Sequence, residues 1–236
     1  MNRPFPTTQW SLIARVAKYD DERRSQALEE LCQLYWPPVY AFIRSKGASR
    51  AEAEDLTQGF FADLLARDDF AKVSSEMGKL RTFLLSSSRN YMANDWRSKQ
   101  CLKRGGGAEV VSLDLTNENS EERIIEPEEK DTPESIFDRQ WALTLLHHVV
   151  ESLRQRYEAK GQGSLFEALR FVISSGSPGT TYKEIAAAEG MSESAVKVAA
   201  HRLKERYGQL LRETIADTLI DDAGVSEELR DLMSAF

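Results

Sequence analysis

Apolar residues recur at three- and four-residue steps through most of the first hundred residues, which is the spacing of one buried face of an α-helix. This pattern predicts helices over about 8–18, 23–46, 49–66 and 80–100. Ser49 and Glu52 are spaced to form a capping box at the start of the third helix, and Gly47 is suited to end the second. Pro37 and Pro38 lie inside the second pattern, so we expect a kink or break there.

The same spacing returns in the second half of the chain. It predicts helices over about 133–157 and 164–174, a compact helix pair within 181–220, and a short amphipathic helix over 226–235. Inside the pair, Gly190 permits the positive φ of a tight turn, and Ser192 can cap the second helix. The residues expected to pack the pair together are Ile185, Ala186, Val196, Ala199 and Leu203. This is the pattern of a helix-turn-helix.

Between these two regions the helical spacing is lost and acidic residues accumulate, which favours an extended or flexible segment. We therefore expect an all-α protein with two small helical domains joined by an acidic flexible linker, and with the helix-turn-helix in the second domain. The expected bounds are 1–104 for the first domain, 105–133 for the linker, 134–220 for the second domain and 221–236 for a C-terminal amphipathic extension.

The charge distribution changes the interpretation of the net charge. The whole chain carries −7, which by itself disfavours a nucleic-acid partner. Residues 79–104, however, hold seven bases and one acid, a net charge of +6. Residues 109–139 hold eleven acids and three bases, a net charge of −8, and residues 213–236 hold seven acids and one base, a net charge of −6. A basic block beside acidic blocks predicts separate surfaces for different partners.

The residues offer little for catalysis or metal binding. Cys32 and Cys101 share no short spacing with each other or with His147, His148 and His201, so we expect no zinc site and no disulfide. The chain lacks a phosphate-binding glycine loop and a nucleophile elbow, so we expect no enzyme activity and no cofactor. Without an apolar run of about eighteen residues or a signal-peptide pattern, the chain is expected in the cytoplasm, with no membrane partner.

Three helices carry candidate binding surfaces. In the helix-turn-helix, Ser194, Lys197, His201 and Lys204 recur on one exposed face that fits a DNA major groove; the alternative is a solvated charged face. Over 79–99, bases alternate with Tyr91 and Trp96, a composition suited to single-stranded DNA; the alternative is that both rings belong to the core. The third helix has an apolar stripe of Ala53, Leu56, Phe60 and Leu64, and outside it carboxylates are mixed with large apolar groups. Such a mixed face suits docking to another protein. Taken by itself, however, it is better explained as a solvated face.

Taken in order, these three segments resemble the ECF (extracytoplasmic function) sigma factors of bacterial RNA polymerase, over about 26–104 and 134–212. The run 53–58 (AEDLTQ) with Phe60 and Phe61 resembles the helix that binds the polymerase clamp. The run 80–85 (LRTFLL) with Arg89-Asn90 and 95–97 (DWR) resembles the helix that melts promoters and reads the −10 element. The runs 182–186 (YKEIA) and 195–197 (AVK) with His201-Arg202 resemble the −35-reading helix-turn-helix.

The resemblance implies a factor that binds core RNA polymerase, directs it to specific promoter DNA and helps to open the −10 region. The polymerase-binding residues would be Glu54, Asp55, Gln58, Phe61 and Leu65. The −10 residues would be Lys79, Arg81, Arg89, Asn90, Trp96, Arg97 and Lys99, aided by the loop 67–78. The −35 residues would be Ser194, Lys197, His201, Arg202 and Lys204. The alternative is a stand-alone helix-turn-helix regulator that does not bind polymerase.

The chain also departs from the family pattern. Gly59 stands where the family often has a third acid, and Ala199 stands where it often has a base. A phosphate on Thr57 would add about −1.5 to −2 charges beside Asp55, where it could strengthen docking to a basic clamp; the favoured alternative is an ordinary helical threonine. A protein kinase is therefore one additional candidate partner, and an anti-sigma factor is another that the family resemblance leaves open. The two terminal segments lie outside the resemblance. Each of them is expected to pack on the domains or, as the alternative, to bind a regulator.

Overall fold

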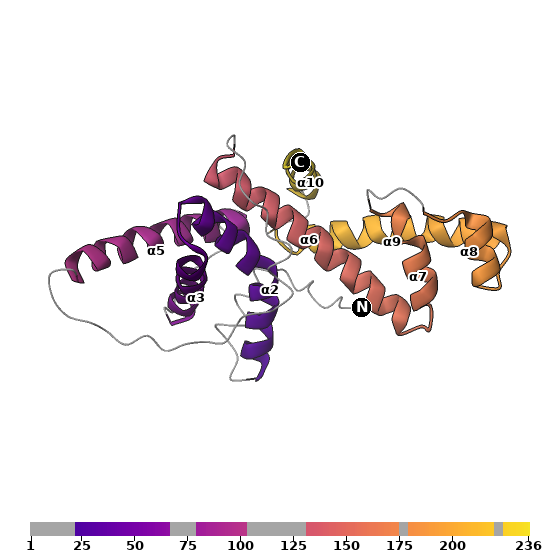
Figure 1. The fold of residues 1–236 in the computed structure, drawn as a ribbon, viewed down its shortest axis with the longest axis horizontal. Coiled ribbons are helices and arrows are strands. Elements are labelled where there is room, and N and C mark those ends of the chain that lie inside the picture. Colours follow the sequence, from indigo (N-terminus) through magenta and orange to yellow (C-terminus); the bar gives the residue numbers. More distant parts are fainter. Residues whose placement is uncertain (1–21, 67–78, 103–130, 175–178, 220–223) are drawn as a thin grey trace, which may run out of the picture. The chain divides into compact units, whose positions relative to one another are not determined.

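The structure is a computed structural model that describes residues 22–66, 79–102, 131–174, 179–219 and 224–236 (Figure 1). All regular elements within these ranges are helical, which confirms the all-α prediction. The expected helix over 8–18, the loop 67–78 and most of the expected linker lie outside the described residues. Within the described part, no helix combines the length and apolar character needed to cross a membrane.

The helices follow the predicted order along the chain. They are α2 (Glu22–Ser45), α3 (Arg50–Ala66), α5 (Leu80–Leu102), α6 (Pro133–Glu158), α7 (Gly163–Leu169), α8 (Tyr182–Ala188), α9 (Glu193–Ala216) and α10 (Val225–Ser234), with a 3-10 turn, η3, at Arg170–Val172. They form two compact units, residues 1–144 with 216–236, and residues 145–215. The units therefore divide within α6 rather than at the expected boundary near 134, and the C-terminal extension is grouped with the first unit.

The core of the first unit lies where α2, α3 and α5 meet. Its large side chains that are at most 2 % exposed include Leu31, Tyr35, Phe42, Ile43, Phe60, Phe61, Leu80 and Leu84. The α-helix continues through Pro37 and Pro38, so the alternative of a break is wrong, and the ribbon of α2 instead bends along its length (Figure 1). Two consecutive prolines remove two helical hydrogen bonds, and the helix bends without ending because its flanking turns are buried in the core.

The turn between α2 and α3 is built by the predicted residues. Gly47 has a φ of +89°, which favours glycine. The Ser49 amide donates to Glu52 Oε2 at 2.9 Å, and the Glu52 amide donates to Ser49 Oγ at 3.3 Å. The capping box is therefore confirmed, and it fixes the start of α3.

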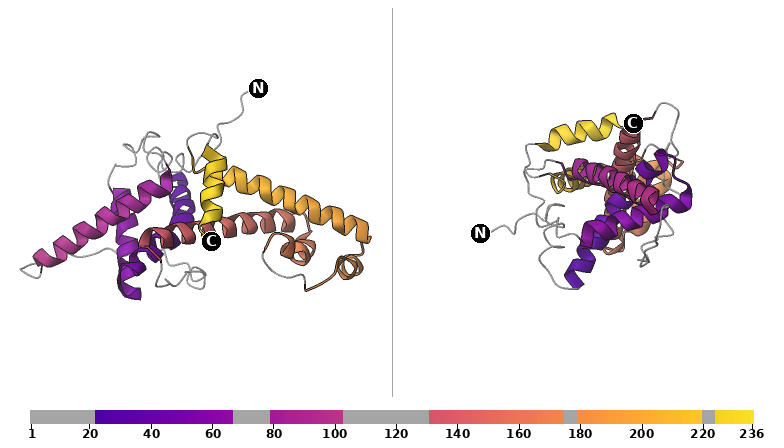
Figure 2. Two further views of the ribbon diagram at one scale, coloured as in Figure 1. Left: turned by 90° about the horizontal axis from the view of Figure 1, so that it is seen from above. Right: turned by 90° about the vertical axis from the view of Figure 1, so that its left-hand side faces the viewer.

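The first unit also contains the beginning of α6 and the helix α10. Figure 2 shows the C-terminal end of α10 beside the first half of α6, and the Arg139 guanidinium there donates to the Ala235 carbonyl oxygen at 3.3 Å. Leu232 is 1 % exposed and anchors α10 by its apolar side. The extension therefore packs on its own domain, one of the two roles considered for it.

The second unit places α8 and α9 around a tight turn. Thr181 and Glu184 form a reciprocal capping box at the start of α8. Gly190 has a φ of +64°, and the Ala195 amide donates to Ser192 Oγ at 3.2 Å, so the predicted turn and cap are both confirmed. The predicted packing residues Ile185, Ala186, Val196 and Leu203 are all buried.

One packing residue of α9 was predicted wrongly. Ala200 is 4 % exposed and faces the core, whereas Ala199 is only half-buried. Spacing alone does not separate the two alanines, because Ala199 and Ala200 each lie three or four positions from both Val196 and Leu203.

Candidate nucleic-acid and protein interfaces

The exposed face of α3 is narrower than predicted, and those predicted docking residues whose described side chains lie on it are polar. Asp55 is exposed, and Glu54 is partly exposed with its carboxylate 3.2 Å from Arg50 Nε. Gln58 is half-buried beside them, and the side chain of Leu65 lies outside the described part. Asp55 lies on the side of α3 away from Thr57 and Phe61. Thr57 is two positions and Phe61 six positions further along, and residues at these spacings point in widely different directions on a helix.

Phe61 does not belong to this exposed face, and its prediction as a docking residue is wrong. Its ring is fully buried, stacks on Trp36 with centroids 5.7 Å apart and meets the edge of Phe60 at 5.2 Å. The buried stripe of α3 is wider than the sequence indicated, since Thr57 and Phe61 join Ala53, Phe60 and Leu64. Leu56, which was assigned to the stripe, is only half-buried.

Thr57 is equally inaccessible. Its side chain is fully buried, and its hydroxyl donates to the Ala53 carbonyl oxygen at 2.6 Å. A phosphate has no room there in the folded protein, so the hypothesis of phosphorylation at Thr57 is wrong.

The basic residues at the beginning of α5 are already paired with acids of the first unit. Lys79 and Arg81 both contact carboxylates of α10. Arg89 Nη2 lies 2.6 Å from Glu134 Oε1 at the beginning of α6. A hydrogen bond to its own backbone amide and the hydrogen bond from Arg89 together lower the pKa of Glu134. These three predicted −10 residues therefore hold anions in the free protein.

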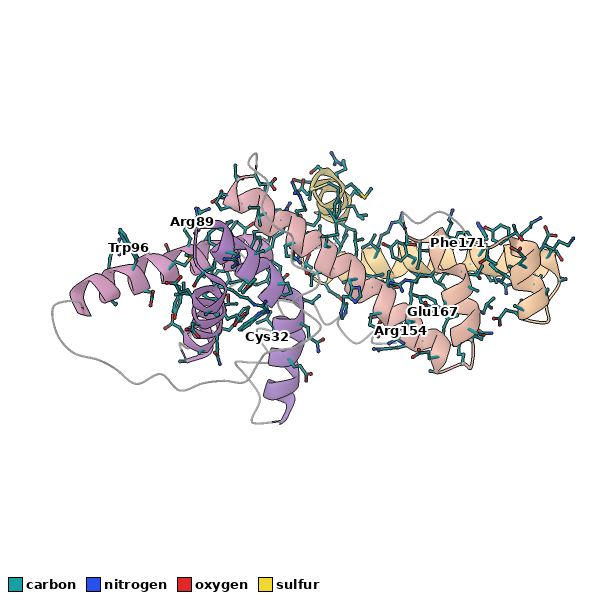
Figure 3. The ribbon with its side chains drawn as sticks, in the orientation of Figure 1. Cys32, Arg89, Trp96, Arg154, Glu167 and Phe171 are labelled. Atoms are coloured by element: carbon teal, nitrogen blue, oxygen red, sulfur yellow. The ribbon has the colours of Figure 1, made fainter. Side chains whose placement is uncertain are left out.

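The later turns of α5 present an accessible surface of a different kind. Asn90 and Arg97 are exposed, and Trp96 is 68 % exposed (Figure 3), where its ring points away from the neighbouring helices. The alternative that Trp96 is a core residue is therefore wrong. The side chain of Lys99 lies outside the described part.

Tyr91, in contrast, packs inward. Its half-buried ring meets the edge of Phe60 with centroids 5.9 Å apart, and burial raises the pKa of its hydroxyl. Gly59 lies directly against this hydroxyl. A Cβ atom at Gly59 would overlap the oxygen and would stand 3.3 Å from Tyr91 Cζ. The contact joins α3 to α5 through a glycine.

All five predicted −35 residues share the exposed side of α9. Ser194, Lys197, His201, Arg202 and Lys204 are exposed, while Val196, Ala200 and Leu203 are buried on the other side. Lys197 Nζ lies 2.7 Å from Glu193 Oε1, and His201 Nε2 lies 3.3 Å from Glu205 Oε1. Such exposed pairs contribute little stability, so they exchange readily for other partners.

The sequence interpretation missed one residue of this face. Val198 is 48 % exposed and borders an open groove together with Ser194, Ala199 and Arg202. It stands four residues after Ser194 and three before His201, so the spacing that selected its neighbours also selects Val198. It was passed over because an apolar residue in a helix is usually a packing residue.

Comparison with known families supports the resemblance. Residues 11–213 match the family described as ECF sigma factor, and this range includes α3, α5, α8 and all but the last three residues of α9. No curated protein and no solved structure matches the chain. The match favours a sigma factor over the stand-alone regulator. The chain therefore belongs to the ECF sigma factor family, which supports a role in promoter-directed transcription initiation and implies core RNA polymerase and promoter DNA as partners.

Proposed function

We propose that the three surfaces divide the work of initiation in this chain. The exposed face of α3, with Glu54, Asp55 and Gln58, docks on a basic surface of core polymerase. The later turns of α5, with Asn90, Trp96 and Arg97, bind the opened −10 region, and the exposed side of α9 reads the −35 element. The observation that carries this proposal is the exposure of Trp96 between polar and basic neighbours.

Exposure of a tryptophan on a sigma factor suits the chemistry of opened DNA. A large apolar ring in water is unfavourable unless it is covered in a complex. Stacking of an unpaired base on such a ring contributes about 1–3 kcal/mol, and Arg97 one residue away can hold the adjoining phosphate. A duplex offers no unpaired base, so this surface favours the opened state over the closed one.

We expect Trp96→Ala and Arg89→Ala to impair DNA opening more than polymerase binding. The ring would no longer stack, and Arg89 would no longer be available to a phosphate. The measurement is permanganate reactivity of promoter thymines with holoenzyme carrying each variant, alongside its affinity for core polymerase. Ser98→Ala, a change at an exposed position of the same helix, is the control. Normal opening by both variants would show that the −10 region is bound elsewhere.

On α9 we expect Lys197 and Lys204 to behave differently. Residues near the start of a recognition helix reach base edges, and later residues contact the backbone. Lys197→Ala should therefore relax specificity at one upstream position and cost about 1–3 kcal/mol. Lys204→Ala should weaken binding evenly across sequences and reduce the salt slope by about one unit. Selection from randomised upstream elements with each holoenzyme tests this, and the reverse assignment would mean that α9 is rotated in the groove.

Val198 is expected to contact the methyl group of a thymine. An exposed β-branched side chain between base-reading neighbours cannot donate hydrogen bonds, and the thymine methyl is the one apolar group that the major groove presents. Replacing that thymine with uracil should cost about 0.8 kcal/mol, or about fourfold in affinity. With Val198→Ala holoenzyme the same replacement should cost little. Equal uracil effects at every position in both proteins would contradict this assignment.

A further inference from the structure

The helix α10 places two carboxylates directly on the basic residues that begin α5. Glu228 is fully buried. Its Oε1 accepts from Arg81 Nε at 2.6 Å, and its Oε2 accepts from Arg81 Nη2 at 3.2 Å and lies 2.5 Å from Lys79 Nζ. Asp231 Oδ2 accepts from Lys79 Nζ at 2.6 Å and from Arg81 Nη2 at 3.0 Å. Both cations are therefore shared between the same two acids.

The first half of α6 completes the surroundings of Arg81. Its Nη1 donates to Asp138, and its guanidinium lies over the ring of Trp141 at 5.2 Å from the centroid. The Arg81 side chain is 12 % exposed as a result. Arg81 was predicted to bind DNA, and in this arrangement a phosphate reaches it only if α10 moves.

The surface that α10 covers has the properties of an anion site. A buried carboxylate such as Glu228 is stable only with cations that replace its lost hydration. Lys79 and Arg81 supply that charge at the N-terminal end of α5, where the helix dipole also favours anions and the first turn holds no acid. A DNA phosphate has the same charge and accepts hydrogen bonds from the same donors. The carboxylates of α10 thus occupy a site of the kind that phosphates use.

We propose that α10 is an internal competitor of nucleic acid, which holds Lys79 and Arg81 in the free protein and leaves them when promoter DNA is bound. The inference rests on the proposed role of α5 in DNA binding. It concerns a segment outside the family match, which ends at residue 213. Since only molecules with α10 released offer the complete basic surface, the apparent affinity for DNA is reduced by the fraction that is released.

The test compares two charge reversals on α10 in the full chain. Asp231→Arg repels Lys79 and Arg81, whereas Glu227→Arg makes the same charge change at an exposed position of the same helix. The probe is a fluorescein-labelled single-stranded DNA of random sequence, measured by anisotropy. We expect Asp231→Arg to bind this DNA about 5-fold or more tightly than Glu227→Arg. Equal affinities would overturn the proposal, because a general gain of positive charge would then explain both.

A second variant tests release of α10 without adding positive charge to the chain. Leu232→Asp disrupts the buried apolar anchor of α10 and makes the chain more acidic. Tighter DNA binding by Leu232→Asp than by the unchanged protein, with the far-ultraviolet circular dichroism of a folded chain, would support release of α10. Weaker binding by a folded Leu232→Asp variant would count against it. In the unchanged protein, hydrogen exchange of the α10 amides should become faster when the DNA is added, and unchanged exchange at saturation would also overturn the proposal.

Trp96→Ala separates this proposal from the function on which it rests. Added to Asp231→Arg, it should lower the DNA affinity, because the stacking of a base on the ring is lost. If the affinity is unchanged, Trp96 does not bind the DNA, and the proposed −10 role of the later turns of α5 fails. If DNA binding depends on Trp96 but Asp231→Arg and Glu227→Arg bind equally, only the competition by α10 fails.

Discussion

Replacing Phe61 with alanine should lower the free energy of unfolding of the first unit by about 3–5 kcal/mol. The ring is fully buried and touches both Trp36 and Phe60, so its removal loses apolar burial and leaves a cavity at the centre of the unit. Urea unfolding of the full chain, followed by circular dichroism, measures the loss. Because the chain has two compact units, its unfolding is to be fitted with two transitions.

Leu56→Ala provides the matched control for Phe61→Ala. Leu56 lies on the same helix but is only half-buried, so its truncation should cost less than half as much. A similar loss for the two variants would contradict the assignment of Phe61 to the core. If Phe61→Ala left stability unchanged and weakened only polymerase binding, the original assignment of Phe61 to the docking face would be restored.

The second large effect is expected at Asp55, on the opposite side of α3. Asp55→Arg should weaken binding to core polymerase by about 2–5 kcal/mol, since it removes a carboxylate from a proposed charge pair and introduces repulsion. The change is at an exposed position, so the free energy of unfolding should move by no more than about 0.5 kcal/mol. Titration of labelled protein with core polymerase gives the affinity, and urea unfolding verifies the fold.

Two further variants make the Asp55 experiment specific. Glu29→Arg makes the same charge change at an exposed position of α2 and should leave polymerase affinity nearly unchanged. Asp55→Asn removes the charge without reversing it and should give an intermediate loss. Equal affinities for Asp55→Arg and the unchanged protein would remove α3 from the proposed docking surface.

The parts of the fold that depend on neighbouring residues could be predicted from the sequence. The turn at Gly47, the box of Ser49 with Glu52, and the turn at Gly190 each involve residues within one helical turn of one another, so residue type and spacing determine them. The exposed side of α9 followed from its three- and four-residue spacing for the same reason.

The parts that depend on distant residues could not be predicted. The width of the buried face of α3 is set by α2 and α5, and nothing within α3 itself indicates that Trp36 covers Phe61. Arg81 had the composition and position of a DNA-binding residue, but its carboxylate partner Glu228 lies 147 residues further along the chain. No local spacing rule reaches across such a separation, and an arginine suited to phosphate is equally suited to carboxylate.

The close approach of Gly59 to Tyr91 restricts the order in which this chain can change during evolution. A side chain at position 59 would overlap the tyrosine hydroxyl with its Cβ atom, so Tyr91 must shift or be replaced before an acid can stand there. A lineage that gains the acid is therefore expected to move or exchange Tyr91, and one that keeps the tyrosine in its present position is expected to keep the glycine. The two positions should therefore covary between subgroups of the family, and a chimaera that imports α3 from a relative will need the matching α5.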